Sequence, residues 1–220
     1  MPSASPATFA LLGLLTKRSW TGYELTQQVR RSLRFVWPVS EGHLYREQQR
    51  IEANGWASVE LEPAGGRSRK RYTITEDGRR ALTEWLSSEP EEPHLQIEGI
   101  LRMFHSEAGD ADDLRRSMET TAGAARAMLD ELVAIADEYL EAGGPLSMLE
   151  ARATGPQEFH GRPVFPERLH GVALALDATT ALLETVERVF AGFDPVHAGD
   201  VPGETREALE RVVSRGLGRA

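Results

Sequence analysis

Residues 40–56, SEGHLYREQQRIEANGW, combine side chains that can read nucleic-acid bases with the apolar spacing of a helix. Glutamine pairs with adenine edges and arginine with guanine edges in the major groove, whereas a tyrosine hydroxyl reaches phosphate. The residues that we expect on the groove face are Ser40, Gly42, His43, Tyr45, Arg46, Gln49 and Arg50. The core face should hold Leu44, Gln48 and Ile51. A solvated polar face is the alternative, and Glu41 and Glu47, which would repel DNA, favour it.

A basic cluster follows this helix. Residues 57–62 and 67–75 alternate apolar and polar side chains as half-buried strands do, and PAGG between them supplies a turn. The candidates for phosphate contact at the exit of the turn are Arg67, Arg69 and Lys70. A charge run is usually only a solvated turn, but this one follows a helix of the right kind. A helix followed by a basic hairpin is typical of a winged helix-turn-helix. The hairpin of that fold, called the wing, lies along the phosphate backbone.

The charge distribution favours a polyanionic partner for the first part of the chain only. The net charge of the whole chain is −9. Residues 1–87 hold 13 Lys and Arg against 9 Asp and Glu, a net charge of +4, whereas residues 88–220 hold 12 against 25, a net charge of −13. Phosphate contacts dominate nucleic-acid affinity, so we expect the first part to bind double-stranded DNA and the acidic second part to have another role.

Other functional classes have no matching pattern. The chain has no cysteine, which excludes disulfides, thiol nucleophiles and cysteine-ligated zinc. Its six histidines lack metal-ligand spacing, and no nucleophile-elbow, dinucleotide-binding or P-loop motif occurs. The apolar run from Phe9 to Leu15 is too short to span a bilayer and lacks the basic residue that precedes a secretion signal. We therefore expect no enzymatic activity, no cofactor, no metal, no membrane partner and a cytoplasmic location.

Apolar spacing and capping residues predict the elements that position the candidate residues. Residues 7–16 are apolar almost all round and predict a buried helix. Thr21 and Glu24 have the spacing of a capping box, and Ser40 and Thr75 are candidate caps of the next two helices. Residues 88–94, SEPEEPH, are rich in Pro and Glu and mark the end of the module.

The order and spacing of these residues carry a resemblance. The positions concerned are the Leu-rich first helix, the run Tyr23–Glu24–Leu25, and Gly42, Leu44, Tyr45, Arg50, Ile51, Glu52, Gly55, Arg69, Lys70, Tyr72, Thr75 and Gly78. Over residues 7–86 the sequence resembles the PadR family of bacterial transcriptional regulators. Gln48 and Gln49 depart from the family pattern, which has Leu and a basic residue there. The second half resembles, in architecture, members with a long helical domain of the virulence-activator type. The resemblance implies a winged helix fold, and small phenolic or drug-like effectors that relieve repression.

Two long apolar seams dominate the second half. From Leu114 to Tyr139, and again from Leu169 to Phe193, apolar side chains recur at alternating spacings of three and four. Residues 146–165 between them are expected to be irregular. The two helices can pair within one chain, or part of each seam can form a homodimer interface. We favour dimerisation because two winged modules read two half-sites, and one reads too few bases. The interface candidates are Leu169, Val172, Leu176, Leu183, Val186 and Phe190.

Four aromatic residues could line an effector pocket, since flat walls suit planar ligands: Phe35, Trp37, Trp56 and Trp85. Ordinary core packing is the favoured interpretation of these residues.

The sequence thus predicts a mainly helical protein with a small β-hairpin wing. Its predicted parts are a winged helix DNA-binding domain (1–87), a linker (88–96), an antiparallel helical dimerisation domain (97–198) and a tail (199–220) that can form one more helix. The favoured function is a homodimeric, sequence-specific repressor that binds a two-half-site operator, with release by a small aromatic effector as an option. The alternative is a helical protein–protein interaction adaptor that does not bind DNA.

Overall fold

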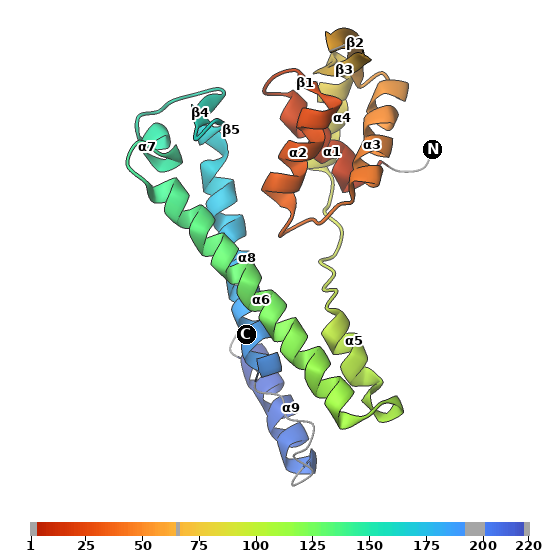
Figure 1. Cartoon of the computed structure of the whole chain (residues 1–220), viewed down its shortest axis with the longest axis vertical. Helices are drawn as coiled ribbons and strands as arrows, with labels where there is room; N and C mark the ends of the chain where they lie inside the picture. Colours follow the sequence, from red (N-terminus) through yellow and green to blue (C-terminus); the bar gives the residue numbers. More distant parts are fainter. Residues whose placement is uncertain (1–3, 65–66, 192–200, 218–220) are drawn as a thin grey trace. The chain divides into compact units, whose positions relative to one another are not determined.

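A computed structural model describes residues 4–64, 67–191 and 201–217 (Figure 1). By compactness the chain divides into two units, Met1–Pro93 with Leu132–Thr179, and His94–Glu131 with Thr180–Ala220. The domain boundaries drawn from the sequence follow composition and stay predictions.

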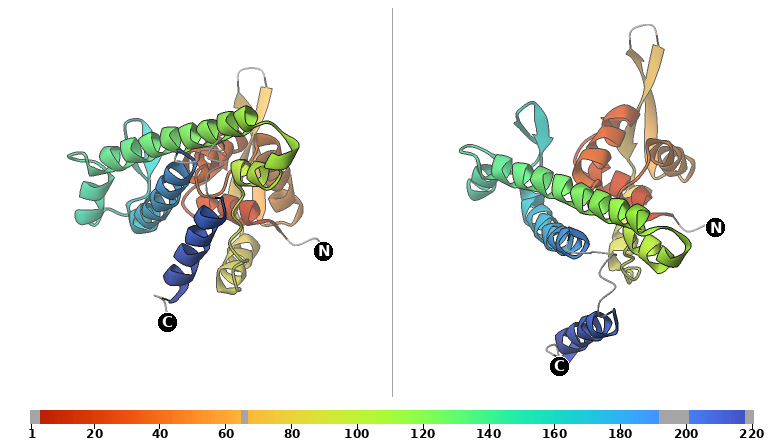
Figure 2. Two further views of the ribbon diagram at one scale, coloured as in Figure 1. Left: turned by 90° about the horizontal axis from the view of Figure 1, so that it is seen from below. Right: turned by 60° about the horizontal axis from the view of Figure 1, so that its bottom comes forward.

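The elements between Pro6 and Ser87 form the predicted winged module. Its elements are α1 (Pro6–Leu15), β1 (Trp20–Thr21), α2 (Gly22–Leu33), α3 (Glu41–Ala53), β2 (Ala57–Ala64), β3 (Arg67–Ile74) and α4 (Glu76–Ser87). The strands form an antiparallel sheet in the order β1–β3–β2, and β2 and β3 make the hairpin that extends from the helices in Figure 2. Strand β1, at the predicted break between the first two helices, pairs Trp20 with Tyr72. This long-range pairing ties the start of α2 to the hairpin.

The predicted caps are confirmed. Thr21 and Glu24 form a capping box, in which the Glu24 N–H donates to Thr21 Oγ1 (3.3 Å) and the Thr21 N–H donates to Glu24 Oε2 (2.7 Å). Ser40 accepts from the His43 N–H at the start of α3, and Thr75 accepts from the Gly78 N–H at the start of α4. These bonds satisfy backbone donors that a helix cannot pair internally. They fix the first turn of three of the module's helices.

Helix α1 is the centre of the module's core. Leu11 and Leu12 are fully buried, as are Leu25 of α2 and Leu44 and Ile51 of α3. The apolar character of α1 on nearly all sides matches its contacts with α2, α3, α4 and β3. Because α1 touches α3 directly, its packing sets where the candidate recognition helix lies.

Among the described residues of the second half, the regular elements are helices and one small hairpin. These elements are α5 (Glu98–Phe104), η1 (Ser106–Ala108), α6 (Ala111–Leu140), α7 (Pro145–Glu150), β4 (Gln157–Phe159), β5 (Arg162–Val164), η2 (Pro166–Arg168), α8 (Leu169–Ala191) and α9 (Val201–Leu217). The two predicted long helices and the helical tail are present. The expectation that residues 146–165 are irregular was wrong, because α7 and the β4–β5 hairpin lie there. His160 and Gly161, both at positive φ, make the two-residue turn that joins the strands.

In the second compact unit, α5, α6 and α8 meet at Gly99. A side chain at Gly99 would lie 2.6 Å from Thr121 Oγ1 and 2.7 Å from Phe190, so only glycine fits between them. Arg126 of α6 and Glu187 of α8 form an ion pair. By length and hydropathy alone Pro166–Ala191 would pass for a membrane span, and only 22% of its apolar window is buried within the chain. A helix of this kind has apolar surface left for a partner.

Candidate nucleic-acid interface

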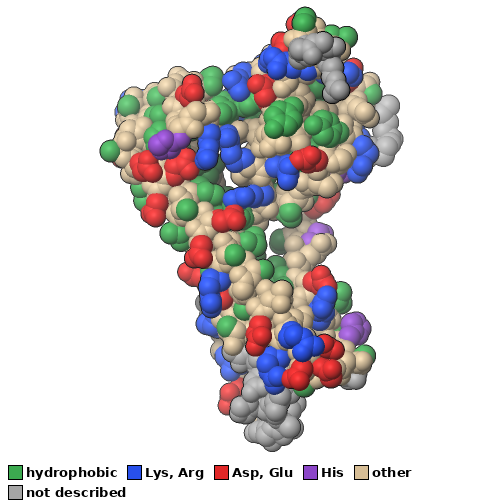
Figure 3. Space-filling view, in the orientation of Figure 1, with side chains coloured by type: hydrophobic (Ala, Val, Ile, Leu, Met, Phe, Trp, Pro, Cys, Tyr) green, Lys and Arg blue, Asp and Glu red, His purple; other side chains and the backbone are tan. Residues whose placement is uncertain are grey.

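The exposed face of α3 holds four of the predicted groove residues. Gly42, Tyr45, Arg46 and Gln49 are exposed and occupy positions i, i+3, i+4 and i+7 of one helical stripe. Tyr45 remains 43% exposed, so it can contact a ligand. The stripe offers a phenol, a guanidinium and a carboxamide without a bulky residue at Gly42. Figure 3 shows basic side chains, with acidic ones among them, over the winged module.

Three further predicted residues flank this stripe. Ser40 is engaged as the helix cap, and His43 and Arg50 are half-buried on the side of α3 that faces α1. His43 Nε2 lies 3.5 Å from Ser5 Oγ, just before α1. The structure therefore places six of the seven predicted residues on α3 and the seventh, Ser40, at its N-cap, with four exposed in one stripe and two half-buried beside it.

Gln48 fastens α3 to α2. Its side chain is 2% exposed, and its Nε2 donates to the Gly22 carbonyl and to Thr26 Oγ1, both at 2.9 Å. A side chain at Gly22 would lie 2.6 Å from Gln48 Oε1, so the close approach of the two helices needs glycine there. The prediction that Gln48 faces the core is confirmed. A polar bridge stands where the resemblance led us to expect a leucine.

The prediction that Glu47 is exposed was wrong. The sequence suggested an exposed carboxylate that repels DNA, but the residue is 2% exposed. Thr8 of α1 donates a hydrogen bond to Glu47 Oε2, and Arg50 Nη1 lies 3.1 Å from the same oxygen. A signal was present in the spacing, since position 47 falls between the core positions Leu44 and Ile51 on the inner side of the helix. The charge of the residue outweighed that signal in the prediction.

The wing cations are exposed and already paired with carboxylates. Arg69 Nε lies 3.2 Å from Glu62 Oε2 across the hairpin, and Lys70 Nζ lies 2.6 Å from Glu52 Oε2 of α3. The side chains of Arg69 and Lys70 are 56% and 46% exposed, so water and salt screen both pairs. The backbone of Arg67 opens β3, but its side chain lies outside the described residues, as do Gly65 and Gly66.

Arg71 has a structural role instead. Its guanidinium bonds to Glu62, and its Nη1 donates to the Ser19 carbonyl at 3.3 Å. The hydrogen bond from Arg71 is the main reason that the pKa of Glu62 lies below its ordinary value. The hydrogen bond with Glu52 likewise raises the pKa of Lys70, so this side chain stays cationic. The wing thus carries permanent positive charge held in place by exposed carboxylates.

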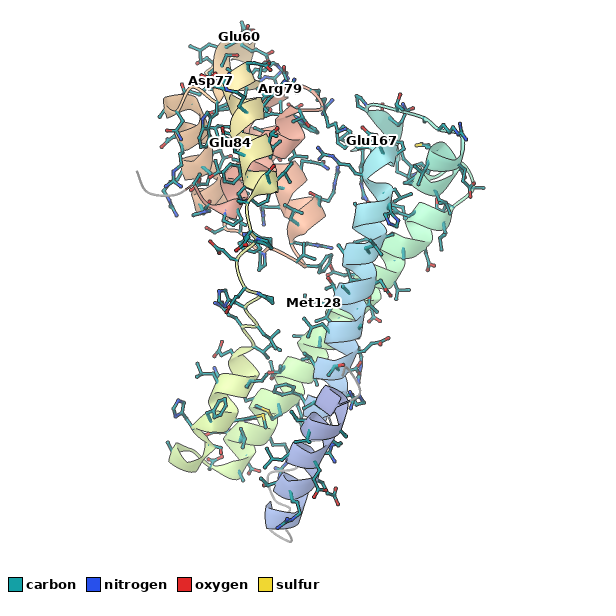
Figure 4. The ribbon with its side chains drawn as sticks, turned by 180° about the vertical axis from the view of Figure 1, so that it is seen from behind. Glu60, Asp77, Arg79, Glu84, Met128 and Glu167 are labelled. Carbon is teal, nitrogen blue, oxygen red and sulfur yellow. The ribbon has the colours of Figure 1, made fainter. Side chains whose placement is uncertain are left out.

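The predicted aromatic residues do not form one group. Trp56 and Trp85 line a cavity of about 310 Å³ together with Phe9, whose ring stacks on Trp85 with centroids 4.8 Å apart. Ala4, Ala81 and Glu84 complete the lining, and Figure 4 shows Glu84 on α4. Phe35 lies under the guanidinium of Arg34, and Trp37 is 47% exposed, so neither lines this cavity. Sequence reasoning missed Phe9 because it assigned that residue to the core alone.

The predicted dimer residues are largely covered by their own chain. Leu169, Leu183, Val186 and Phe190 are buried within it, and Val172 and Leu176 are half-buried. The large apolar residues of α8 that are exposed are Leu174, Leu182 and Val189. Packing within the chain explains part of the seam, and another strip of α8 carries the open apolar surface.

Within the first compact unit, the start of α8 is fastened to α1. Arg168 Nη2 donates to the Gly13 carbonyl at 2.5 Å, and Lys17 Nζ lies 2.6 Å from Glu167 Oε1. Trp20 and Phe165 add an aromatic contact with ring centroids 6.3 Å apart. Burial is the main reason that the pKa of Arg168 lies below its ordinary value. These contacts fix the base of the winged module to the segment that leads into α8.

Comparison with known proteins agrees with this geometry. Residues 11–84 match the family model described as the transcriptional regulator PadR-like family. The match lies within the winged module and makes this part of the chain PadR-like. Curated relatives include the negative transcriptional regulator PadR of Bacillus subtilis, 29% identical over 36% of this chain, and a probable transcriptional regulator of Mycobacterium tuberculosis, 32% identical over 38% of this chain. These matches span 43% and 44% of the relatives' own lengths, less than half of each.

Solved structures extend the likeness of the PadR-like chain beyond the winged module. A Streptococcus mutans UA159 protein gives a TM-score of 0.65 at 17% identity and covers 84% of this chain and 95% of its own. Bacillus subtilis PadR in complex with operator DNA gives a TM-score of 0.59 at 18% identity, and the match covers 84% of this chain and 96% of that one. The Vibrio cholerae virulence activator AphA gives a TM-score of 0.57 at 22% identity, and the match again covers 84% of this chain and 96% of that one. At these identities the likeness establishes the fold, and the predicted mainly helical fold with a hairpin wing is confirmed.

Proposed function

We propose that this PadR-like protein is a sequence-specific DNA-binding transcriptional repressor that acts as a homodimer on an operator of two half-sites. One observation carries the proposal: the exposed stripe of Gly42, Tyr45, Arg46 and Gln49 lies on the helix that immediately precedes a cationic hairpin. In this arrangement α3 enters the major groove, Arg46 and Gln49 meet base edges, and Tyr45 reaches a phosphate.

The wing supplies the phosphate contacts of the proposal. Arg69 and Lys70 exchange their screened carboxylate partners for DNA phosphates, which carry a higher density of charge. Charge-assisted bonds to phosphate also fix the register of α3 in the groove. Bacillus subtilis PadR, which has a similar fold, was solved in complex with operator DNA, and this supports DNA as the partner.

Dimerisation is the second element of the proposal. Leu174, Leu182 and Val189 follow one another along α8 at spacings of eight and seven residues and stay exposed. Exposed apolar side chains that lie along one side of a helix form a surface that a protein partner can bury. A second copy that covers this strip would pair two winged modules for two half-sites, as genomic specificity requires.

Regulation is the third element. The contacts of Arg168 and Lys17 make the winged module move with the start of α8, so a change at the dimer interface changes the spacing of the two recognition helices. Half-site spacing is fixed by the DNA helical repeat, so a shift of a few ångströms is enough to release the operator.

An aromatic effector fits the cavity of Phe9, Trp56 and Trp85. Flat walls favour planar ligands, and the carboxylate of Glu84 favours a neutral or cationic ring over an anionic one. A Bacillus subtilis PadR structure holds p-coumaric acid, an anion at neutral pH, so the two compounds to compare are p-coumarate and N-methylquinolinium, a planar cation. We expect only the cation to quench tryptophan fluorescence, with loss of the effect in Trp85→Leu. Quenching by p-coumarate alone would refute this ligand class.

Selection of genomic DNA fragments bound by the purified protein tests the proposed function. Enrichment of short paired repeats is the expected result, and their separation gives the half-site spacing. Uniform retention would reduce the activity to non-specific phosphate binding. Failure of the folded protein to retain any DNA would refute the regulator, and the helical adaptor would become the leading function.

A further inference from the structure

Glu47 is the one charged residue among the buried side chains in the part of the chain that the structure describes. It lies on α3, four residues after His43 and three before Arg50, which places all three on neighbouring turns of one side. A carboxylate buried in a protein is stable only with cationic or hydrogen-bonding partners, because it has lost its water. The partners of Glu47 therefore indicate which side chains its charge holds in place.

The partners come from two helices. Oε2 of Glu47 accepts a hydrogen bond from Thr8 of α1, which is completely buried, and lies 3.1 Å from Arg50 Nη1. Oε1 lies 3.5 Å from His43 Nε2. One carboxylate therefore connects the central helix of the module to two side chains that border the exposed stripe of α3.

This contact changes what Arg50 can do at DNA. A guanidinium has five N–H donors in a rigid plane, and the bond to Glu47 uses Nη1 alone. The side chain of Arg50 stays 36% exposed, so other donors remain open in a fixed direction. The charge of Arg50 is at the same time neutralised by its buried partner. An arginine of this kind has a fixed orientation, but it adds little to the sequence-independent affinity for DNA phosphates.

We propose that Glu47 is a positioning residue, which orients Arg50 on the α1 side of the recognition face. Arg50 then contributes to discrimination between sequences more than to overall affinity. This inference rests on the proposed function, because it assigns a task to Arg50 only if α3 binds DNA.

The test compares Glu47→Gln with the wild-type protein on a selected operator fragment and on a scrambled duplex of equal length. Glutamine keeps the size of the side chain and removes its charge, which releases Arg50. We expect the operator-to-scrambled affinity ratio to fall about tenfold, within the range that one arginine–base contact supplies. The salt slope of binding to the scrambled duplex should steepen by about 0.9 for each module, since a freed cation releases counterions. An unchanged ratio and slope would overturn the inference.

A double-mutant cycle separates positioning from a merely structural role. If Glu47 acts through Arg50, Glu47→Gln has no further effect on the ratio in an Arg50→Gln background. An effect of the same size in that background would overturn the inference. Asp77→Asn is the matched control, because it breaks an exposed carboxylate–arginine pair on α4, the pair with Arg80 at 2.6 Å. It should leave the ratio as it is.

A second variant covers the case in which Glu47→Gln does not fold. Thr8→Val removes the tie from α1 and keeps the charge of Glu47, so we expect a ratio about threefold lower, a fraction of one base contact, at an unchanged salt slope. An unchanged ratio in folded Thr8→Val would overturn the inference. A wild-type protein without sequence preference would instead refute the proposed function itself, and the positioning role with it.

Discussion

Replacement of both wing cations, Arg69→Ala with Lys70→Ala, should reduce the salt dependence of DNA binding by an amount that can be calculated. Each phosphate contact adds about 0.9 to the slope of log affinity against log salt. Two cations on each of two wings give four contacts in the proposed dimer, hence a slope smaller by about 3.6. Over a fourfold rise in salt, the wild-type protein should lose on the order of 100-fold more affinity than the variant.

The existing ion pairs decide whether this calculation applies. Lys70 and Arg69 have carboxylate partners in the free protein, at 2.6 and 3.2 Å, so each must exchange that partner for phosphate. Both pairs are exposed and screened, which makes them weak, whereas a cation in contact with phosphate also releases counterions. We therefore expect the exchange to occur. If the pairs persisted in the complex, the slope would not depend on these residues.

Fluorescence anisotropy on a selected operator at four or more salt concentrations measures the slope. The control is Arg79→Ala with Arg80→Ala, which makes the same change of charge on α4. The reasoning is refuted if the wing variant keeps the wild-type slope, or if the α4 variant loses as much slope as the wing variant.

Three further predictions concern stability. Gln48→Ala should lower the free energy of unfolding by about 2–3 kcal/mol, because two hydrogen bonds are lost and a void remains. Gln48→Leu should stay within about 1 kcal/mol of wild type, because apolar packing offsets the lost bonds. Denaturant unfolding of both variants measures the two losses, and equal losses would contradict the prediction. Lys17 donates a hydrogen bond to Glu167 and so lowers the pKa of the Glu167 carboxyl from its ordinary value of 4.5. The resulting stabilisation is fully present at pH values above 4.5 and is lost as the pH falls through the lowered pKa. The destabilisation by Lys17→Met should therefore be seen near neutral pH and shrink in acid, as thermal unfolding at several pH values would show; a difference that does not vary with pH would argue against it. Gly78→Ala should destabilise by about 1–3 kcal/mol, since a Cβ there would lie 2.1 Å from the Trp56 carbonyl oxygen, and Gly123→Ala, with open space around it in α6, should stabilise by about 0.5–1 kcal/mol. Equal effects of the two glycine changes on the melting temperature would refute that explanation.

The sequence alone was sufficient where the determining interactions are local. Thr21 and Glu24 are three residues apart, so their capping box could be predicted, and so could the caps at Ser40 and Thr75. The alternation on both sides of the turn at residues 63–66 predicted the β2–β3 hairpin for the same reason. The exposed stripe of α3 followed from helical spacing.

Tertiary packing decided what those local rules leave open. Glu47 is buried because α1 brings Thr8 against it from 39 residues away, and no short-range pattern encodes that contact. Phe9 joined Trp56 and Trp85 for a similar reason, while Phe35 and Trp37 were left outside because the α2–α3 connection that carries them runs elsewhere on the surface. The pairing of β1 with β3 and the ties of Arg168 to α1 are also long-range. The sequence therefore determined the elements and their exposed faces, because caps, turns and apolar periods act over a few residues. Only the tertiary structure decided which charged and aromatic side chains meet, because those contacts join segments far apart in the chain.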